Sequence, residues 1–236
     1  MKSFLAVLIG LILCSCANDK QQHNFKLKGY VKGLKKGTVY LQKQEDSTVI
    51  TLDSLEVKGN PNFELHTNLE EPEVLYLKLD KNVKDEEMIV FFADTGTTEI
   101  NSTLKLFNYN AKIKGSKQQE VLDDYLTMIT KSNNRNLDML QSNFEALKNS
   151  PDSIKDKSFQ EQQNKFLRLK YSATINFALN NRDSEVAPYL AIYEVPNTSI
   201  RFLDTIYNAL DNDIKASKYG KLLKDTIDKR KEAELN

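Results

Sequence analysis

The spacing of the apolar residues changes once along this chain, at Gly115, and this change restricts the fold more than any other feature. Before Gly115 the apolar residues form short runs, many of them alternating with polar residues, as in Phe25 and Leu27. After it they follow a helical spacing, shown by Val121, Leu122, Tyr125, Leu126 and Ile129. Strands place alternate side chains on one face, whereas helices bring residues three and four apart together. The pattern predicts a β domain followed by a helical domain.

Turn residues divide the first part into short segments, as at Gly59-Asn60-Pro61-Asn62 and Glu71-Pro72. The predicted strands lie at 25–31, 39–41, 49–52, 63–65, 74–79, 89–92, 99–100, 104–106 and 111–113. Short strands with a turn about every ten residues are typical of an antiparallel sandwich or an open barrel. We therefore expect residues 24–115 to form a β-sandwich-like domain.

Residues 116–236 are predicted to be helical. A proline in the first turn after a serine marks a helix start at Ser150-Pro151-Asp152, and Asn180 to Ser184 ends that helix. Apolar stripes fall at 137–147, 166–177, 203–210 and 222–227. The expected fold class is α+β in two segregated parts, the antiparallel β-sandwich-like domain first and the helical domain second.

The N-terminus reads as an export signal. One lysine precedes an apolar run from Phe4 to Leu13, which is about half the length that a membrane-spanning helix needs. The run ends at Leu13-Cys14-Ser15-Cys16, which resembles the lipobox of bacterial lipoproteins. We expect a signal peptide at 1–15, cleavage between Ser15 and Cys16, and a tether at 16–23. The alternatives are an ordinary signal peptide with chance cysteines, or a buried N-terminal strand.

Acyl chains on Cys16 would hold the protein in a bilayer through the burial of their methylene groups. The expected location is the cell envelope, at the periplasmic or surface face of the outer membrane. The bilayer is the expected partner, together with an envelope protein or a small ligand.

Composition excludes several kinds of chemistry. The chain has 33 basic and 33 acidic residues, so no basic surface indicates nucleic acid. Removal of Cys14 and lipidation of Cys16 would leave no thiol for disulfides or catalysis. A metal site or a Ser-His-Asp triad would have to rest on His66, because the other histidine, His23, lies in the predicted tether. We expect no cofactor, no metal and no catalytic residue.

Several motifs in the first half occur in a recognisable order. They are Gly29-Tyr30-Val31-Lys32-Gly33-Leu34, Gly37-Thr38-Val39-Tyr40-Leu41, Leu52-Asp53-Ser54, Phe63, Pro72, Leu75-Tyr76-Leu77, Phe91-Phe92 with Gly96, and Ile113-Lys114-Gly115-Ser116. In this order they resemble the domain-of-unknown-function 4369 family. The resemblance implies a lipoprotein of the Bacteroidetes type, in which this domain often precedes a thioredoxin-like thiol–disulfide domain. The helical segments Ser184 to Ala187 and Ser217 to Lys221 are similar to the linker region of those proteins.

Relatives of this kind continue into a Cys-x-x-Cys domain, whereas this chain stops at Asn236. The resemblance therefore implies a fold and a location, with no redox activity and no catalytic residues.

The segment Phe91 to Thr98 contains Asp94-Thr95-Gly96-Thr97 after two apolar residues. Aspartic proteases present a catalytic carboxylate in this way, but they need two aspartates that share one proton. One copy would require a homodimer. The alternative is a glycine-bearing hairpin turn between strands.

Other candidates are less specific. Asp53 and Ser54 can form a site, or a turn in which their side chains bond nearby backbone amides. Calcium can be bound by acidic pairs that converge, although such pairs more often form solvated surfaces. The pairs are Glu70-Glu71, Glu86-Glu87 and Asp123-Asp124.

Five tyrosines can line a ligand groove between the two domains, or contribute half-buried rings to the core. They are Tyr76, Tyr171, Tyr189, Tyr193 and Tyr207.

The leading hypothesis for function is a membrane-anchored envelope lipoprotein with a non-enzymatic binding or accessory role. A second hypothesis is an accessory partner of a separate thioredoxin-like thiol–disulfide exchange protein. A third is a homodimeric aspartic protease that uses Asp94.

Overall fold

The computed structural model describes residues 23–45, 47–81, 87–148 and 154–235. The predicted signal peptide, its cleavage site, Cys16 and the tether up to residue 22 lie outside the described residues, as does the predicted helix start at Ser150. Within the described part, no helix is both long enough and apolar enough to cross a membrane.

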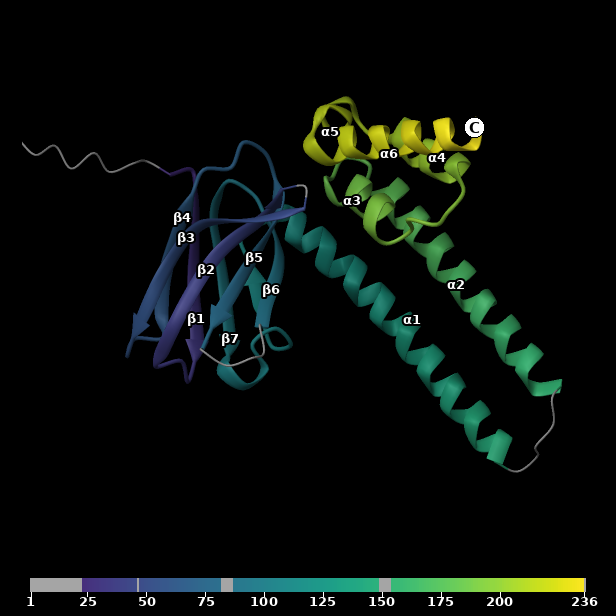
Figure 1. Ribbon diagram of the computed structural model, residues 1–236, viewed down its shortest axis with the longest axis horizontal. Coiled ribbons are helices and arrows are strands. Elements are labelled where there is room, and N and C mark those ends of the chain that lie inside the picture. Colours follow the sequence, from purple (N-terminus) through teal and green to yellow (C-terminus); the bar gives the residue numbers. More distant parts are fainter. Residues whose placement is uncertain (1–22, 46, 82–86, 149–153, 236) are drawn as a thin grey trace, which may run out of the picture.

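The first half folds into two four-stranded sheets, seen as arrows in Figure 1. One sheet has the order β4 (Asn62–Thr67), β1 (Phe25–Lys32), β7 (Gly96–Thr103), β8 (Lys112–Lys114). The other has the order β3 (Thr48–Lys58), β2 (Lys36–Glu45), β5 (Glu73–Asp80), β6 (Glu87–Ala93). Alternate residues of β1 and β5 point into a shared apolar core that includes Phe25, Leu27, Leu75 and Leu77. The predicted sandwich is confirmed.

Three local predictions were wrong. β1 and β7 pair in parallel, so the first sheet is mixed and not purely antiparallel. The predicted strand Leu104–Leu106 is a 3₁₀ helix, in which Leu106 is exposed while the adjacent Phe107 is fully buried. Asp53 and Ser54 lie within β3 and not in a turn.

The second half is helical, as predicted. Its elements are α1 (Lys117–Lys148), α2 (Ile154–Asn180), α3 (Val186–Tyr193), α4 (Ile200–Ala209), α5 (Asn212–Ala216) and α6 (Lys218–Leu235). In Figure 1, α1 starts beside β6, and the α1–α2 pair points away from the sandwich. The other helices gather near the start of α1 and share a core with the last turns of α2.

Apolar spacing predicted the long helix α2 correctly. It did not predict which side of the helix is buried. Leu169, in the predicted stripe, is largely exposed, whereas Thr174, Ile175 and Ala178 are buried. The core of the helical domain contacts only the C-terminal end of α2, so the periodic stripe nearer its start has no core to pack against.

A third apolar cluster joins the two domains. The sandwich contributes Val74 and Phe92 from the outer face of its second sheet, and the helices contribute Leu122, Tyr125, Val186, Leu190 and Tyr219. The cluster also brings the start of α6 close to β5. Gly220 lets the start of α6 lie close against α5, because a Cβ there would lie 1.9 Å from the carbonyl oxygen of Ile214.

Candidate ligand-binding site

Carboxylates of the sandwich bond the first amides of two helices. Asp94 Oδ2 accepts hydrogen bonds from the backbone N–H groups of Lys117 (2.7 Å) and Gln118 (3.3 Å) at the start of α1. Glu71 Oε2 accepts one from the N–H of Lys218 (2.7 Å) at the start of α6. These amides have no partner within their own helix, and a negative charge there also interacts favourably with the helix dipole. The sandwich thus fixes where both helices begin.

Side chains of the helices, in turn, bond the backbone of the sheet. Gln119 Oε1 accepts the N–H of Phe92 (2.7 Å) on the edge strand β6, and the Tyr219 hydroxyl accepts the N–H of Val74 (3.0 Å) on β5. Both bonds are buried. The Phe92 ring contacts Tyr189 and Tyr219 edge-on, with centroids 5.6 and 5.5 Å away. These contacts hold the helical domain on the outer face of the sheet.

A cavity of about 380 Å³ lies beside this junction. Its walls come from β2 and β5 on one side and from α3 and α6 on the other. We call it the tyrosine pocket, because four of its lining residues are Tyr76, Tyr189, Tyr193 and Tyr219. The remaining lining residues are Gln44, Val74, Lys218 and Leu222. Both domains are therefore needed to form it.

The aromatic rings of the pocket form a connected group. Tyr189 lies at its centre, with ring centroids 4.8 Å from Tyr193 and 5.5 Å from Tyr219. Tyr219 is buried, whereas 53% of Tyr193 is exposed, so one ring of the group remains accessible from outside. Across the pocket, the hydroxyl of Tyr76 lies 3.5 Å from Gln44 Oε1.

The pocket has balanced charge and neutral hydroxyls. The Lys218 ammonium pairs with the largely buried carboxylate of Glu73. Burial raises the pKa of Tyr189 to about 12 and raises the pKa of Tyr76 and Tyr219 above the ordinary value. The hydroxyls of all three therefore remain protonated at physiological pH and can donate as well as accept hydrogen bonds.

A buried carboxyl group lies near the pocket, where α3 begins. Glu185 is 4% exposed and accepts a hydrogen bond from the Ser217 hydroxyl (2.7 Å). Burial, together with the negative charges of Glu71 and Asp94, raises its pKa to about 7, although the hydrogen bond from Ser217 acts in the opposite direction. Its own N–H bonds Gln118 Oε1 (3.0 Å). Glu185 thus titrates near neutral pH at the point where α1, α3 and α6 meet the sandwich.

The comparison with known families agrees with this architecture. Residues 25–122 match the family described as Domain of unknown function (DUF4369). The β-sandwich of this chain is therefore similar to the domains of that family. The match covers all eight strands and the first six residues of α1. No curated protein matches the chain. The matched region supplies Gln44, Val74 and Tyr76 to the tyrosine pocket, and the helices beyond it supply the rest.

Three of the five tyrosines predicted for a groove between the domains do line one. Tyr76, Tyr189 and Tyr193 are at the pocket, whereas Tyr171 and Tyr207 pack partly buried against the core of the helical domain. Sequence reasoning missed Tyr219, Lys218 and Gln44 as lining residues. The first two lie in the segment Ser217 to Lys221 that carried part of the family resemblance. Gln44 had no distinguishing signal.

The predicted site at Asp94 has a structural function at the domain junction. The turn that contains it is not a hairpin, because it connects β6 of one sheet to β7 of the other. Gly96 has φ +108°, a conformation that glycine adopts without strain. One oxygen of Asp94 is occupied by the amides of α1. Helix capping accounts for the aspartate at this position.

Asp53 also bonds backbone amides, although from within a strand. Its Oδ1 accepts the N–H of Ser54 and its Oδ2 accepts the N–H of His66, both at 2.7 Å. The second bond joins β3 to β4 and so ties the two sheets together. Asp53 and Ser54 lie at the edge of the sheet opposite β6, away from the tyrosine pocket.

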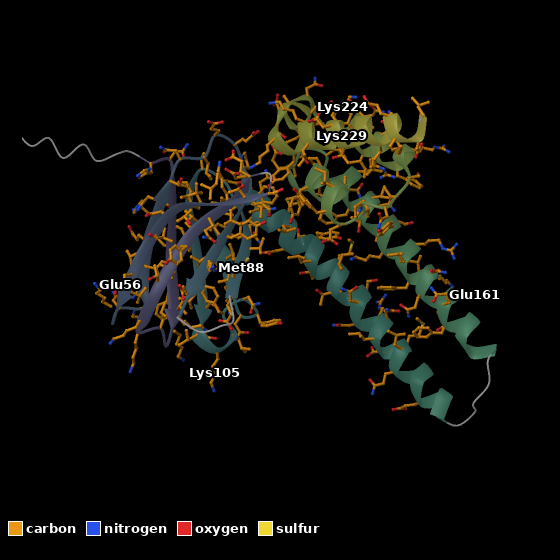
Figure 2. The ribbon with its side chains drawn as sticks, viewed as in Figure 1. Glu56, Met88, Lys105, Glu161, Lys224 and Lys229 are labelled. Atoms are coloured by element: carbon orange, nitrogen blue, oxygen red, sulfur yellow. The ribbon has the colours of Figure 1, made fainter. Side chains whose placement is uncertain are left out.

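The histidines and the acidic pairs lie at separate places. His23 lies near His66, with ring centroids 5.9 Å apart. Glu87 pairs with Lys81 (2.9 Å), Asp123 accepts a bond from Gln119 (2.7 Å), and Glu86 lies outside the described residues. In the part of the chain that the structure describes, no three His, Cys, Asp or Glu side chains are grouped to hold a metal. The lysines of α6, including Lys224 and Lys229 in Figure 2, are spread along that helix, and Lys224 pairs with Asp228.

Proposed function

We propose that this protein is a lipid-anchored envelope lipoprotein that binds a small molecule in the tyrosine pocket. The observation that carries the proposal is the pocket itself, formed jointly by the β-sandwich and the helices that follow it. Small-molecule sites are concave, largely aromatic or apolar, and contain a few well-placed polar groups. The tyrosine pocket has these properties, and its volume falls at the lower end of the roughly 300–1,000 Å³ that such sites occupy.

The arrangement of the walls supports a binding role. The amides of Val74 and Phe92 and the starts of α1 and α6 are held by hydrogen bonds between the domains. Side chains that are fixed before the ligand arrives lose little conformational entropy on binding. A binding site needs this kind of pre-organisation, whereas two domains joined only for stability can pack without leaving a cavity.

The proposed anchor is Cys16, on the basis of the lipobox-like Leu13-Cys14-Ser15-Cys16. The described fold begins at His23, so a short polar segment would connect the lipid to the sandwich. Such an arrangement would keep the binding domain close to the membrane surface while leaving it free to reorient.

The proposal can be tested with fluorine NMR. The full-length chain, labelled with 3-fluorotyrosine and purified in a detergent without a sugar head group, carries ten tyrosines that can report on binding. Tyr→Phe variants assign the resonances. Small molecules of several classes are then added one at a time.

A ligand of the pocket should shift the resonances of Tyr76, Tyr189 and Tyr193 and leave that of Tyr109 unchanged. Tyr109 is 83% exposed on the sandwich and is the matched control. If no class of small molecule shifts the pocket resonances, the proposed function is wrong.

A further inference from the structure

The charges of the tyrosine pocket restrict the ligand that it can bind, provided that the proposed function is correct. Lys218 is the cation of the lining, and its ammonium is already neutralised by Glu73. An anionic ligand would have to displace a largely buried carboxylate from that ammonium, which would leave Glu73 buried without its partner. Removing one member of a buried ion pair is strongly unfavourable.

A cationic ligand fits the pocket no better. Aromatic faces attract cations, but the cation–π position next to Tyr219 is taken by Lys218, whose Nζ lies 5.9 Å from the ring centroid. Glu73 already pairs with Lys218, and none of the residues that line the pocket is acidic, so no carboxylate of the lining is left to balance the charge of a second cation. The pocket therefore selects against net charge of either sign.

A purely apolar ligand would take water away from polar groups of the lining without bonding to them. Tyr76, Tyr189 and Tyr193 belong to the lining, together with Gln44, whose Oε1 accepts a hydrogen bond from the Tyr76 hydroxyl (3.5 Å). Buried hydroxyl and amide groups that lose water and gain no hydrogen bond penalise binding. The ligand must offer both donors and acceptors to these groups.

The exposed ring of Tyr193 adds a last requirement. Tyr193 packs against Tyr189, with ring centroids 4.8 Å apart, and 53% of Tyr193 stays exposed, so a ligand can approach a face of its ring. A ligand that covers this face needs a flat apolar side of its own, while its edges hydrogen-bond to the hydroxyls.

We propose that the tyrosine pocket binds a neutral saccharide, with one sugar ring stacked on Tyr193 and its hydroxyl groups bonded to Tyr76 and Gln44. A pyranose has an apolar C–H face and a rim of hydroxyls that both donate and accept, and it carries no charge. The cavity of about 380 Å³ limits the bound part to one or two sugar units.

The experiment compares probes of matched size in calorimetric titrations of the full-length chain. The saccharides are the methyl glycosides of glucose, galactose and N-acetylglucosamine, together with cellobiose and lactose. The comparison probes are tetramethylammonium, inorganic phosphate and cyclohexanol, which test the cationic, anionic and apolar alternatives. Fluorotyrosine NMR records which tyrosines each probe contacts.

At least one saccharide should bind, and its affinity should exceed that of each comparison probe. Tyr193→Ala should weaken that binding about tenfold because the stacking surface is removed, whereas Tyr193→Phe should stay within about twofold. Tyr76→Phe should weaken it about fivefold through loss of one hydrogen bond. Tyr109→Ala, which removes an exposed ring outside the pocket, should have no effect.

The outcomes separate the two proposals. If tetramethylammonium, phosphate or cyclohexanol shifts the pocket tyrosines while no saccharide does, the saccharide proposal is overturned and the binding function stands. If no probe shifts them, both are overturned. Saccharide binding that survives Tyr193→Ala but is lost in Tyr109→Ala also overturns the proposal, because the sugar would then bind elsewhere.

Discussion

The hydrogen bond from the Val74 N–H to the Tyr219 hydroxyl should be a main determinant of how firmly the domains are joined. The bond is buried, and Tyr219 also packs its ring against Phe92 and Tyr189. Tyr219→Phe keeps the ring and removes only the acceptor. The Val74 N–H is then left buried without a partner, at a cost of about 1–3 kcal/mol. A cost of this size changes the equilibrium constant for opening of the bond by about 5- to 150-fold.

Urea unfolding measures the loss of global stability, and amide hydrogen exchange at Val74 measures the loss of local stability. Both are needed because the two domains need not unfold together. We expect the Val74 amide to exchange about 5- to 150-fold faster in Tyr219→Phe. Tyr109→Phe is the control, since Tyr109 is 83% exposed and its substitution should change stability by less than about 0.5 kcal/mol. Unchanged exchange at Val74 in Tyr219→Phe would refute the inference that this bond joins the domains.

Three further predictions concern other parts of the chain. Asp94→Ala should lower the free energy of unfolding in urea by about 1 kcal/mol because the first amides of α1 lose their acceptor. Asp94→Asn should lower the free energy of unfolding less. Wild-type stability in Asp94→Ala would contradict the capping role. Burial raises the folded-state pKa of Glu185 to about 7, so the protonated carboxyl stabilises the fold below about pH 4.5. This stabilisation should be lost as the pH rises through about 7, and the free energy of unfolding should fall by on the order of 3 kcal/mol. Glu185→Gln should flatten this part of the stability–pH curve and be more stable than wild type at pH 8, and a curve identical to wild type would show that another group titrates. Cys16→Ala should abolish incorporation of labelled acyl chains and release the protein from membranes, so a variant that still takes up label would disprove lipidation at that residue.

The strands of the sandwich could be predicted from sequence because burial repeats along them. Phe25 and Leu27 alternate with exposed lysines on β1, and the same alternation recurs on β5, so local pattern and tertiary environment agree. At Leu104–Leu106 they do not agree. Three residues with apolar ends are too few to distinguish a strand from a turn of helix, and the buried residue that decides the matter, Phe107, lies just outside them.

The pocket was only partly predictable, for a different reason. Tyr189 and Tyr193 are four residues apart and so lie on one face of a helix, which sequence can indicate. Whether that face meets Tyr76 of the sandwich depends on the bonds between the domains, such as those of Asp94, Glu71 and Gln119. Contacts between residues so far apart in the chain leave no periodic pattern, and for this reason Tyr171 and Tyr207 could not be separated from the tyrosines of the pocket.

A crystal structure of the chain with its tightest-binding saccharide tests the central claim most directly. The account predicts density for one sugar ring beside Tyr193, between β5 and the helices α3 and α6, with hydroxyls bonded to Tyr76 and Gln44. Density for the sugar on the exposed face around Tyr109, with the tyrosine pocket empty, would contradict it.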